Sequence, residues 1–440
     1  IKDKSLRRAY FSTPLNLLKK LNAQDWQEFI KLLISQEAWP PLFNVIGLAQ
    51  QASLGPAPQW SLEQARSLVY GGKVTKALTR LKADLVQSLD PLGQAKAYEA
   101  LAVALFHSGK EQSILSSFKK AYQLFGQAKD YEGAVHVLIT WGLWHLKQQG
   151  LSQAQPLFNK AAALLEKFKA SFSLQIKYTL ALARFYFEAT DFDQAQACLD
   201  QVQNFLGKDL YPNFYLPWAV LKASLEREQE RPSLAQETIK EALPWGYLGA
   251  QWDELWQAES LLASLSASEM GSSQAGELWS NALWAARSSQ NQEGILKSLL
   301  HRARHALFFH RTQEALADLE EARNLAEETK HLLFWLEASL WEIRALRTQG
   351  ISQGVLAKRF VPLETFWKKN PLKELSWLYY WELGELKRLG GEEKPAKQAL
   401  TQAMGEMEAY AKTLRPFLRK LFLQDGKLEE IKSSLKWLEP

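Results

Sequence analysis

The chain of 440 residues contains one cysteine, Cys198, and this scarcity excludes two kinds of structural support. A single thiol can form neither an internal disulfide nor a thiolate zinc site within one chain. A cytosolic protein and an exported protein without disulfides have similar cysteine contents, so the count leaves the compartment open. At Cys198 we expect a packed thiol on the inner face of a helix rather than a nucleophile.

Long apolar segments are also missing. The longest candidate, from Ala134 to Leu146, has the length of a buried helix and is too short to span a membrane. We therefore expect a cytoplasmic protein, with a periplasmic or secreted location after removal of an N-terminal signal as the alternative. Residue 1 is Ile1 rather than methionine, which is typical of a processed chain or a piece of a longer protein.

An excess of one charge is missing as well. Lysine and arginine number 53 and aspartate and glutamate 48, for a net charge of +5, so we expect no nucleic-acid partner. Glycine and proline are few, at 23 and 16, and no β-branched residues alternate with polar ones as they do in strands. The composition, with 47% hydrophobic residues, is that of an ordinary globular protein, but the length favours several domains or a repeat array.

A repeat is present. Small or apolar anchor residues recur every 37 to 41 residues, at Ala77, Ile114, Ala154, Ala195, Ala235, Ala275, Ala315, Val355 and Ala396. A larger, usually apolar residue follows each anchor after four positions, and a small or apolar one after seven, which is the spacing of one helix face. Twelve residues before the anchors lie small residues that let a second helix approach closely: Ala65, Ala102, Gly142, Ala183, Ala223, Ala263, Ala303 and Gly384. Glycines expected to take positive φ lie between the two helices, at Gly72, Gly109, Gly150, Gly350 and Gly391.

These residues resemble the tetratricopeptide repeat, in which a small residue of a first helix, helix A, packs against alanines of a second, helix B. Tyr98–Ala121 and Leu138–Ala161 match the family pattern well. The period is nearer to 40 than to the family's 34, similar to the longer arrays of kinesin light chains and MalT-type regulators. The resemblance implies an all-α, right-handed superhelix of helix pairs.

Three domains follow from this pattern. Residues 1–57 are expected to form an N-terminal helical cap, residues 58–410 a solenoid of about nine helix pairs, and residues 411–440 capping helices that close the last apolar face. The eighth repeat departs from the pattern at Ile343, Arg359 and Pro362. Because proline disrupts a helix interior, helix B of that repeat is expected to end or bend between Arg359 and Val361.

No catalytic arrangement emerges. The segment from Gly71 to Thr75 lacks the spacing of a phosphate-binding loop. His301 and His305 share a helix face, but Arg304 between them opposes a metal ion. Asp193 is expected to cap a helix. The sequence therefore predicts no enzymatic activity, no cofactor and no metal.

The family's concave groove is lined by positions 2, 5, 9 and 12 of helix A, and arginine stands at four of the nine position-9 sites. Through the resemblance, the predicted partner-binding residues are Arg66, Lys96, Phe106, Lys177, Arg184, Phe187, Arg227, Lys297, Arg304, Arg344, Arg347, Trp381 and Arg388. Acids are fewer at these positions, namely Glu99, Glu337 and Glu385. Arginine suits carboxylates, so the groove would suit an acidic peptide with aromatic residues or a helix with an acidic face. The alternative is that these arginines only pair with neighbouring acids.

Three functions remain open on the sequence. The first is a scaffold or adaptor that binds a segment of a partner protein in the groove. The second is a ligand-sensing or regulatory arm of a larger MalT-like protein, and the third is a peptide receptor of the Rap type. The lack of a phosphate loop or a DNA-binding helix-turn-helix favours the first, whereas helices ahead of the repeats favour the second.

Overall fold

The computed structural model describes residues 57–70, 74–107, 113–148, 150–206, 212–249, 251–267, 273–424 and 426–438. These ranges contain 21 α-helices, one 3-10 helix and no strand, so the prediction of an all-α chain is confirmed for them. None of these helices is long and apolar enough to cross a membrane. The predicted N-terminal cap, apart from Ala57, and the turns at Gly72 and Gly109 lie outside the described residues.

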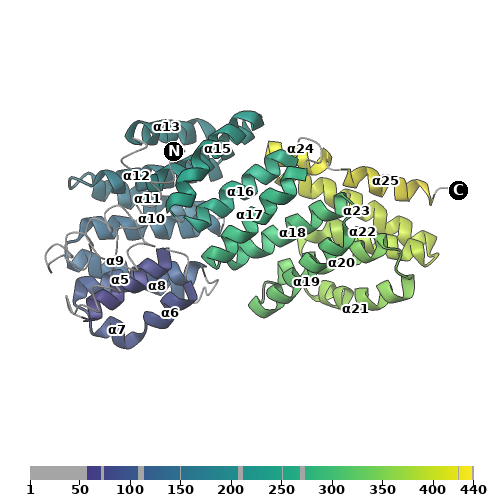
Figure 1. Ribbon diagram of the computed structural model, residues 1–440, viewed down its shortest axis with the longest axis horizontal. Helices are drawn as coiled ribbons and strands as arrows, with labels where there is room; N and C mark the ends of the chain where they lie inside the picture. The colour runs from purple at the N-terminus through teal and green to yellow at the C-terminus, as the bar shows by residue number, and fades with distance from the viewer. Residues whose placement is uncertain are drawn as a thin grey trace, which may run out of the picture. The chain divides into compact units, whose positions relative to one another are not determined.

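The helices follow one another in pairs, labelled as in Figure 1, and the first of each pair is here called helix A and the second helix B. The pairs are α5 (Ala57–Tyr70) with α6 (Val74–Arg80), α8 (Pro91–His107) with α9 (Ile114–Gln127), α10 (Tyr131–Lys147) with α11 (Leu151–Leu165), α12 (Phe172–Glu188) with α13 (Phe192–Phe205), α14 (Pro212–Glu228) with α15 (Pro232–Gly249), α16 (Trp252–Ala267) with α17 (Ser273–Ser289), α18 (Gln292–Phe308) with α19 (Thr312–Thr329), α20 (Leu332–Thr348) with α21 (Gln353–Lys369), and α22 (Ser376–Leu389) with α23 (Glu393–Thr413). Short connectors are α7 (Ala83–Gln87) and η2 (Lys373–Leu375), and two helices follow the last pair, α24 (Pro416–Gln424) and α25 (Lys427–Lys436).

The chain divides into two compact units. Unit 1 comprises Ile1–Leu225, Leu234–Ala258 and Ala285–Asn291, and unit 2 comprises Glu226–Ser233, Glu259–Trp284 and Gln292–Pro440. Unit 1 thus contains α5 to α13 and unit 2 contains α18 to α25, while α14 to α17 contribute residues to both.

The core of each repeat lies where its helix A meets its helix B. Eight of the nine predicted anchors are buried, from Ala77 and Ala154 at 0% exposure to Ile114 at 1%. The predicted close approach of the two helices is confirmed at Gly142 of α10, where an added Cβ would lie 2.7 Å from the ring of Phe158 in α11. Helix packing therefore requires the small side chains that the sequence repeats.

We expect Gly142→Leu to lower the free energy of unfolding by about 1–3 kcal/mol, because the added carbons must enter this contact. Urea unfolding followed by circular dichroism measures the change. Gly126→Leu is the matched control, since no heavy atom lies within 4 Å of a Cβ built at Gly126. An equal effect at the two positions would show that the Gly142 contact is not close.

The eighth repeat is shifted in register by one residue. The predicted anchor, Val355, is 46% exposed. Because α21 continues through Pro362, the helix does not end between Arg359 and Val361, and the alternative of a bend there stays a prediction. Both Arg359 and Pro362 lie on the exposed side of α21. Burial on the opposite side offsets the hydrogen bond that proline cannot donate. The buried face of α21 consists of Leu356, Phe360, Leu363 and Trp367.

Of the three described glycines for which a positive φ was predicted, two have it. Gly350 and Gly391 take φ of 77° and 73°, whereas Gly150 has φ of −91° and is the N-cap of α11. Among the residues that the structure describes, six that are not glycine adopt the left-handed conformation: Lys129, Thr190, Glu230, Gln290, His310 and Lys330. After Thr190 the N-cap of α13 is Asp191, not the predicted Asp193, and its carboxylate accepts a hydrogen bond from the Gln194 N–H at 3.2 Å.

Thr190 is the most strained of these residues, because a β-branched side chain at φ of 61° crowds its own backbone. We expect Thr190→Gly to raise the free energy of unfolding by about 0.5–1 kcal/mol, the steric relief exceeding the entropy lost on ordering a glycine. Thermal unfolding measures the change. Gly350→Ala should act in the opposite direction, and a destabilised Thr190→Gly variant would contradict the argument.

Candidate partner-binding face

In unit 1, charged side chains from successive helices A form one chain of contacts. Nδ1 of His136 in α10 pairs with the carboxylate of Glu99 in α8. Nζ of Lys177 in α12 lies 2.8 Å from Nε2 of the same ring. Because an ammonium group can only donate, Nε2 accepts the hydrogen bond from Lys177, and Nδ1 carries the proton donated to Glu99. The chain of contacts therefore ties together α8, α10 and α12.

Glu99 is the buried centre of this chain, with 2% exposure. Burial alone raises the pKa of its carboxyl, but His136, Arg66 and Lys177 outweigh burial and hold the pKa at about 2. The carboxylate of Glu99 thus stays ionised across the range in which most carboxyls gain a proton.

The two predicted arginines of unit 1 pair with acids of their own helices. Arg66 pairs with Glu63 at 3.0 Å, and Nε of Arg184 donates to Glu188 at 2.9 Å. The side chain of Arg184 is 45% exposed. Arg184 is thus a predicted site residue with a substantial surface available to solvent.

The predicted aromatic residues of unit 1 lie at different depths. Phe187 is buried, with 3% exposure. Phe106 and Lys96 of α8 are half-buried, and the ammonium group of Lys147 lies 4.8 Å from the centre of the Phe106 ring. Phe106 therefore offers apolar surface next to a positive charge.

In unit 2, arginines and tryptophans alternate across three helices A. The guanidinium of Arg304 in α18 lies 5.3 Å from the ring of Trp341 in α20, and that of Arg344 lies 5.3 Å from the same ring. Arg344 also lies 4.0 Å from the ring of Trp381 in α22. Trp381 is 1% exposed, so its ring packs beneath Arg344 and is closed to solvent. Such cation–π contacts between desolvated groups help hold the helices in register.

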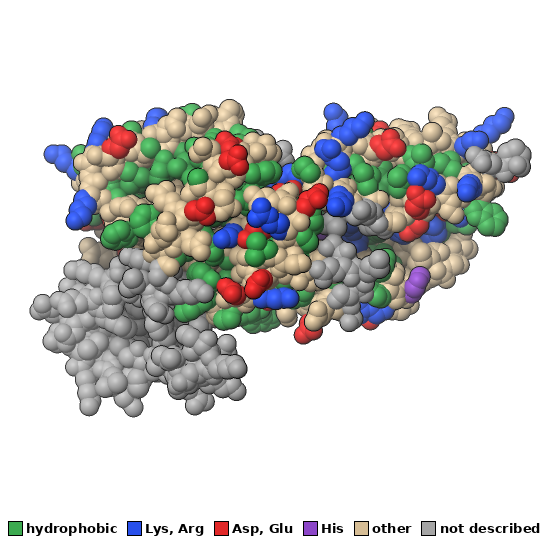
Figure 2. Space-filling view, turned by 90° about the horizontal axis from the view of Figure 1, so that it is seen from above, with side chains coloured by type: hydrophobic (Ala, Val, Ile, Leu, Met, Phe, Trp, Pro, Cys, Tyr) green, Lys and Arg blue, Asp and Glu red, His purple; other side chains and the backbone are tan. Residues whose placement is uncertain are grey.

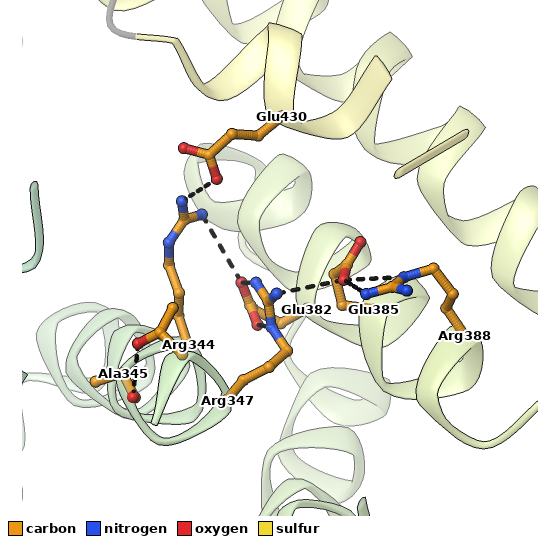
Figure 3. Close-up of polar contacts among 8 residues, drawn as sticks. Arg344, Ala345, Arg347, Glu382, Glu385, Arg388 and Glu430 are labelled. Carbon is orange, nitrogen blue, oxygen red and sulfur yellow. Dashed lines mark hydrogen bonds and ion pairs between the residues drawn. The ribbon is translucent and has the colours of Figure 1, made fainter. Parts of the chain in front are cut away.

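Three glutamates pair with the arginines of α20 and α22, namely Arg344, Arg347 and Arg388 (Figure 3). Glu382 of α22, with 0% exposure, accepts hydrogen bonds from Nε and Nη2 of Arg347 at 3.1 and 3.2 Å. Glu385 bridges Arg347, at 3.2 Å, and Arg388, at 2.8 Å. Arg344 points from α20 toward Glu430 of α25 and pairs with it.

Burial and charge act in opposite directions on these groups. Burial lowers the pKa of Arg344 despite Glu382 and Glu430. Burial would also lower the pKa of Arg347, but Glu382 and Glu385 raise it. The network therefore keeps its charges only as a set, because each buried ion depends on its partners.

The two C-terminal helices extend over side chains of this face. Lys427 of α25 is 6% exposed, and its Nζ lies 5.6 Å from the ring of Trp377 and 5.3 Å from that of Phe422. Phe417 of α24 lies 5.9 Å from the guanidinium of Arg227. The C-terminal helices thus contact predicted site residues as well as the last helix pair.

The remaining predicted cations of unit 2 are also paired. Arg227 donates to Glu228 at 2.9 Å, and Lys297 donates to Glu293 at 2.7 Å. The structure thus brings most of the predicted cations together with carboxylates of the same chain, which is the alternative that the sequence left open. Their role in binding a partner stays a prediction.

The histidines and the cysteine have structural neighbours. His301 stacks on Trp279 with 4.5 Å between ring centres, and burial lowers its pKa to about 3. Nδ1 of His305 lies 3.2 Å from Arg311. Burial raises the pKa of the half-buried Cys198 thiol. Within the described ranges, no group of three or more His, Cys, Asp or Glu residues is placed to hold a metal ion.

Figure 2 shows one face of the molecule, on which basic and acidic side chains are interspersed among apolar ones. On the part of this face that the structure describes, neither sign of charge dominates.

Sequence reasoning missed three parts of this face. His136 stands at position 2 of its helix A and could have been read from the repeat, as Lys177 was. Glu382 lies between two groove positions, where the repeat gives no signal. Glu430 lies outside the repeats and pairs with a residue 86 positions away, which no local pattern predicts.

The chain was compared with known proteins. No protein-family model matches it, and a search among curated proteins finds no match. Among solved structures, a signal-transduction ATPase with a tetratricopeptide repeat sensor, PH0952 from Pyrococcus horikoshii, is similar with a TM-score of 0.56 and 14% identity over 80% of this chain and 55% of that one. A Rap protein in complex with competence and sporulation factor has a TM-score of 0.49 and 12% identity, over 86% and 98%. The quorum sensor NprR from B. thuringiensis has 0.46 and 11%, over 79% and 99%.

The chain spans little more than half of that ATPase, and at 14% identity the likeness shows the fold alone. Consecutive helix pairs, small residues at the contact within each pair and this likeness agree with one another. The chain is a tetratricopeptide-like α-helical repeat protein by fold.

Proposed function

We propose that this chain is a binding scaffold whose helices A hold a segment of a partner protein, and that the segment carries carboxylates. We call the charged and aromatic side chains that the helices A contribute to this surface the A-helix face. In unit 1 they include Arg66, Lys96, Glu99, Phe106, His136, Lys177 and Arg184. In unit 2 they include Arg304, Glu337, Trp341, Arg344, Arg347 and Arg388, which are supported by the buried Trp381, Glu382 and Glu385.

The partial exposure of Arg184 is the observation that carries this proposal. Its guanidinium has five N–H donors, and its hydrogen bond to Glu188 uses Nε. With 45% of its side chain exposed, Arg184 can turn donors toward a carboxylate of another protein. Lys96 and Phe106, both half-buried in α8, supply a further charge and an apolar surface in the same unit.

A second proposal is that the chain is the sensing arm of a larger regulator. The likeness to an ATPase whose repeats are named a sensor, and the short share of that protein that is matched, favour this reading. Both proposals use the A-helix face. The second proposal expects an ATPase domain in the same protein and the first does not, so the full gene sequence distinguishes the two.

The test begins with a pull-down and mass spectrometry, followed by affinity measurements on the recovered protein. Arg184→Glu should weaken binding by about tenfold, as expected for a lost charge-assisted hydrogen bond. Arg311→Glu is the matched control, because Arg311 is 44% exposed and pairs with Glu314 at the start of helix B.

Salt gives an independent readout. Raising the ionic strength from roughly 0.01 M to 0.15 M shortens the Debye length from about 30 Å to about 8 Å, so the affinity of the wild type should fall. Equal affinities for the two charge-reversal variants, both folded by circular dichroism, would place the binding site elsewhere on the chain.

A further inference from the structure

The last two helices of unit 2 present to the rest of that unit the same chemistry that the sequence predicts for a partner. Glu430 of α25 offers a carboxylate to Arg344, and Phe417 of α24 offers an aromatic ring to Arg227. Lys420 of α24 also approaches Glu230, at 3.8 Å. Both arginines belong to the set predicted to hold an acidic segment with aromatic residues.

We propose that residues 416–438, here called the C-terminal segment, occupy the A-helix face of unit 2 in place of the partner. The partner is then an amphipathic helix that displaces α25. This inference rests on the proposed function of the A-helix face and names the partner class. Until such a helix binds, the C-terminal segment keeps Arg344 covered.

The size of α25 makes such an exchange feasible. The helix has ten residues, and isolated helices shorter than about 12–15 residues are marginal in water. Docking therefore depends on the contacts of α25, chiefly those of the fully buried Ile431 and the partly buried Leu428 and Leu435, and on Leu438 just after the helix. A competing helix with a similar apolar stripe can replace these contacts one for one.

Lys427 makes the docking of α25 weaker than an apolar residue at the same position would. Its side chain is buried among rings, where Arg304 and Arg344 repel it and Glu337 and Glu430 attract it. Burial is the largest influence and lowers the pKa of Lys427 well below its ordinary value. An apolar residue in its place would pack against Trp377 and Phe422 without removing a charge from water.

These contacts specify the partner helix. An apolar residue replaces Lys427, a glutamate follows three positions later to pair with Arg344, as Glu430 does, and an apolar residue comes next, as Ile431 does. Positions three and four apart lie on one helix face, so all three side chains reach the protein together.

The experiment uses the full chain with one protease site inserted between Leu414 and Arg415, after the end of α23. After cleavage and removal of the endogenous segment, a fluorescein-labelled peptide of residues 416–438 is titrated into the nicked protein and its anisotropy recorded. We expect saturable binding that weakens with salt, because the contact includes an ion pair.

Three peptide variants test the contacts. Lys427→Met should bind at least about fivefold more tightly, and Glu430→Arg at least about fivefold more weakly. Glu429→Arg is the matched control and should change the affinity less than about twofold, because Glu429 is 74% exposed and pairs within α25 with Lys432.

Each result of this experiment either supports the proposal or overturns it. A nicked protein that unfolds, or that never releases the segment, would show that α24 and α25 are permanent parts of the core and would overturn the proposal, as would equal binding of all peptides. Partner binding through Arg184 in unit 1 is measured separately. It can therefore fail while the peptide exchange succeeds, or succeed while the exchange fails.

Discussion

Glu382→Ala should lower the free energy of unfolding of unit 2 by about 3–5 kcal/mol. The substitution removes a carboxylate with 0% exposure that receives two hydrogen bonds from Arg347. The guanidinium of Arg344, 4.0 Å from Glu382, loses a compensating charge as well. Buried arginines without a carboxylate retain the full penalty of leaving water, which makes this loss larger than that of the carboxylate alone.

Chemical unfolding followed by tryptophan fluorescence measures this loss. Glu364→Ala is the control, because Glu364 pairs with the exposed Lys368 and should contribute less than about 0.5 kcal/mol. A double variant, Glu382→Leu with Arg347→Met, should recover part of the stability, since no charge is then left without its partner. A loss below about 1 kcal/mol in Glu382→Ala would mean that the network does not hold α20 to α22.

Glu99→Gln should have the second largest effect, about 3 kcal/mol at neutral pH in unit 1. The pKa of Glu99 falls from an ordinary value of 4.5 to about 2 on folding, and this difference corresponds to about that free energy. The glutamine keeps an oxygen that accepts a hydrogen bond from His136 but loses the charge that attracts Arg66 and Lys177.

The pH dependence follows from the lowered pKa. A carboxyl whose pKa is lower in the folded state stabilises the fold fully above its unfolded pKa, and this contribution is lost as the pH falls toward the folded pKa. The stability gap between wild type and Glu99→Gln should therefore close between about pH 5 and pH 2. Glu237→Gln, at an exposed position of unit 1, is the control. A gap that stays constant over this range would contradict the assignment to Glu99.

The repeat was predictable because its signal is steric and local. A small residue is needed wherever helix A meets helix B, as at Gly142, so the requirement recurs with the period of the fold. The eighth repeat was misplaced because Val355 and Leu356 are both apolar and allow two adjacent registers. The exposed Arg359 and Pro362 distinguish the registers in the structure.

The candidate face was predictable only in part. Equivalent positions on successive helices A could be read from the repeat, which is why Arg344 and Arg347 were found. The acids that neutralise them could not, because Glu382 is 35 residues from Arg347 and Glu430 is 86 residues from Arg344. Such pairing depends on how later helices pack and on the path of the C-terminal segment, and neither is encoded in local spacing.

Site-specific photocrosslinking tests the central claim, that helices A bind the partner, most directly. A photoreactive phenylalanine analogue is placed at Leu180, a half-buried position of helix A one turn before Arg184, and in a second variant at Lys160, an exposed position on helix B of the preceding repeat. We predict that the recovered partner crosslinks from position 180 and not from position 160. Crosslinking from position 160 alone would place the partner on helices B and would contradict the account.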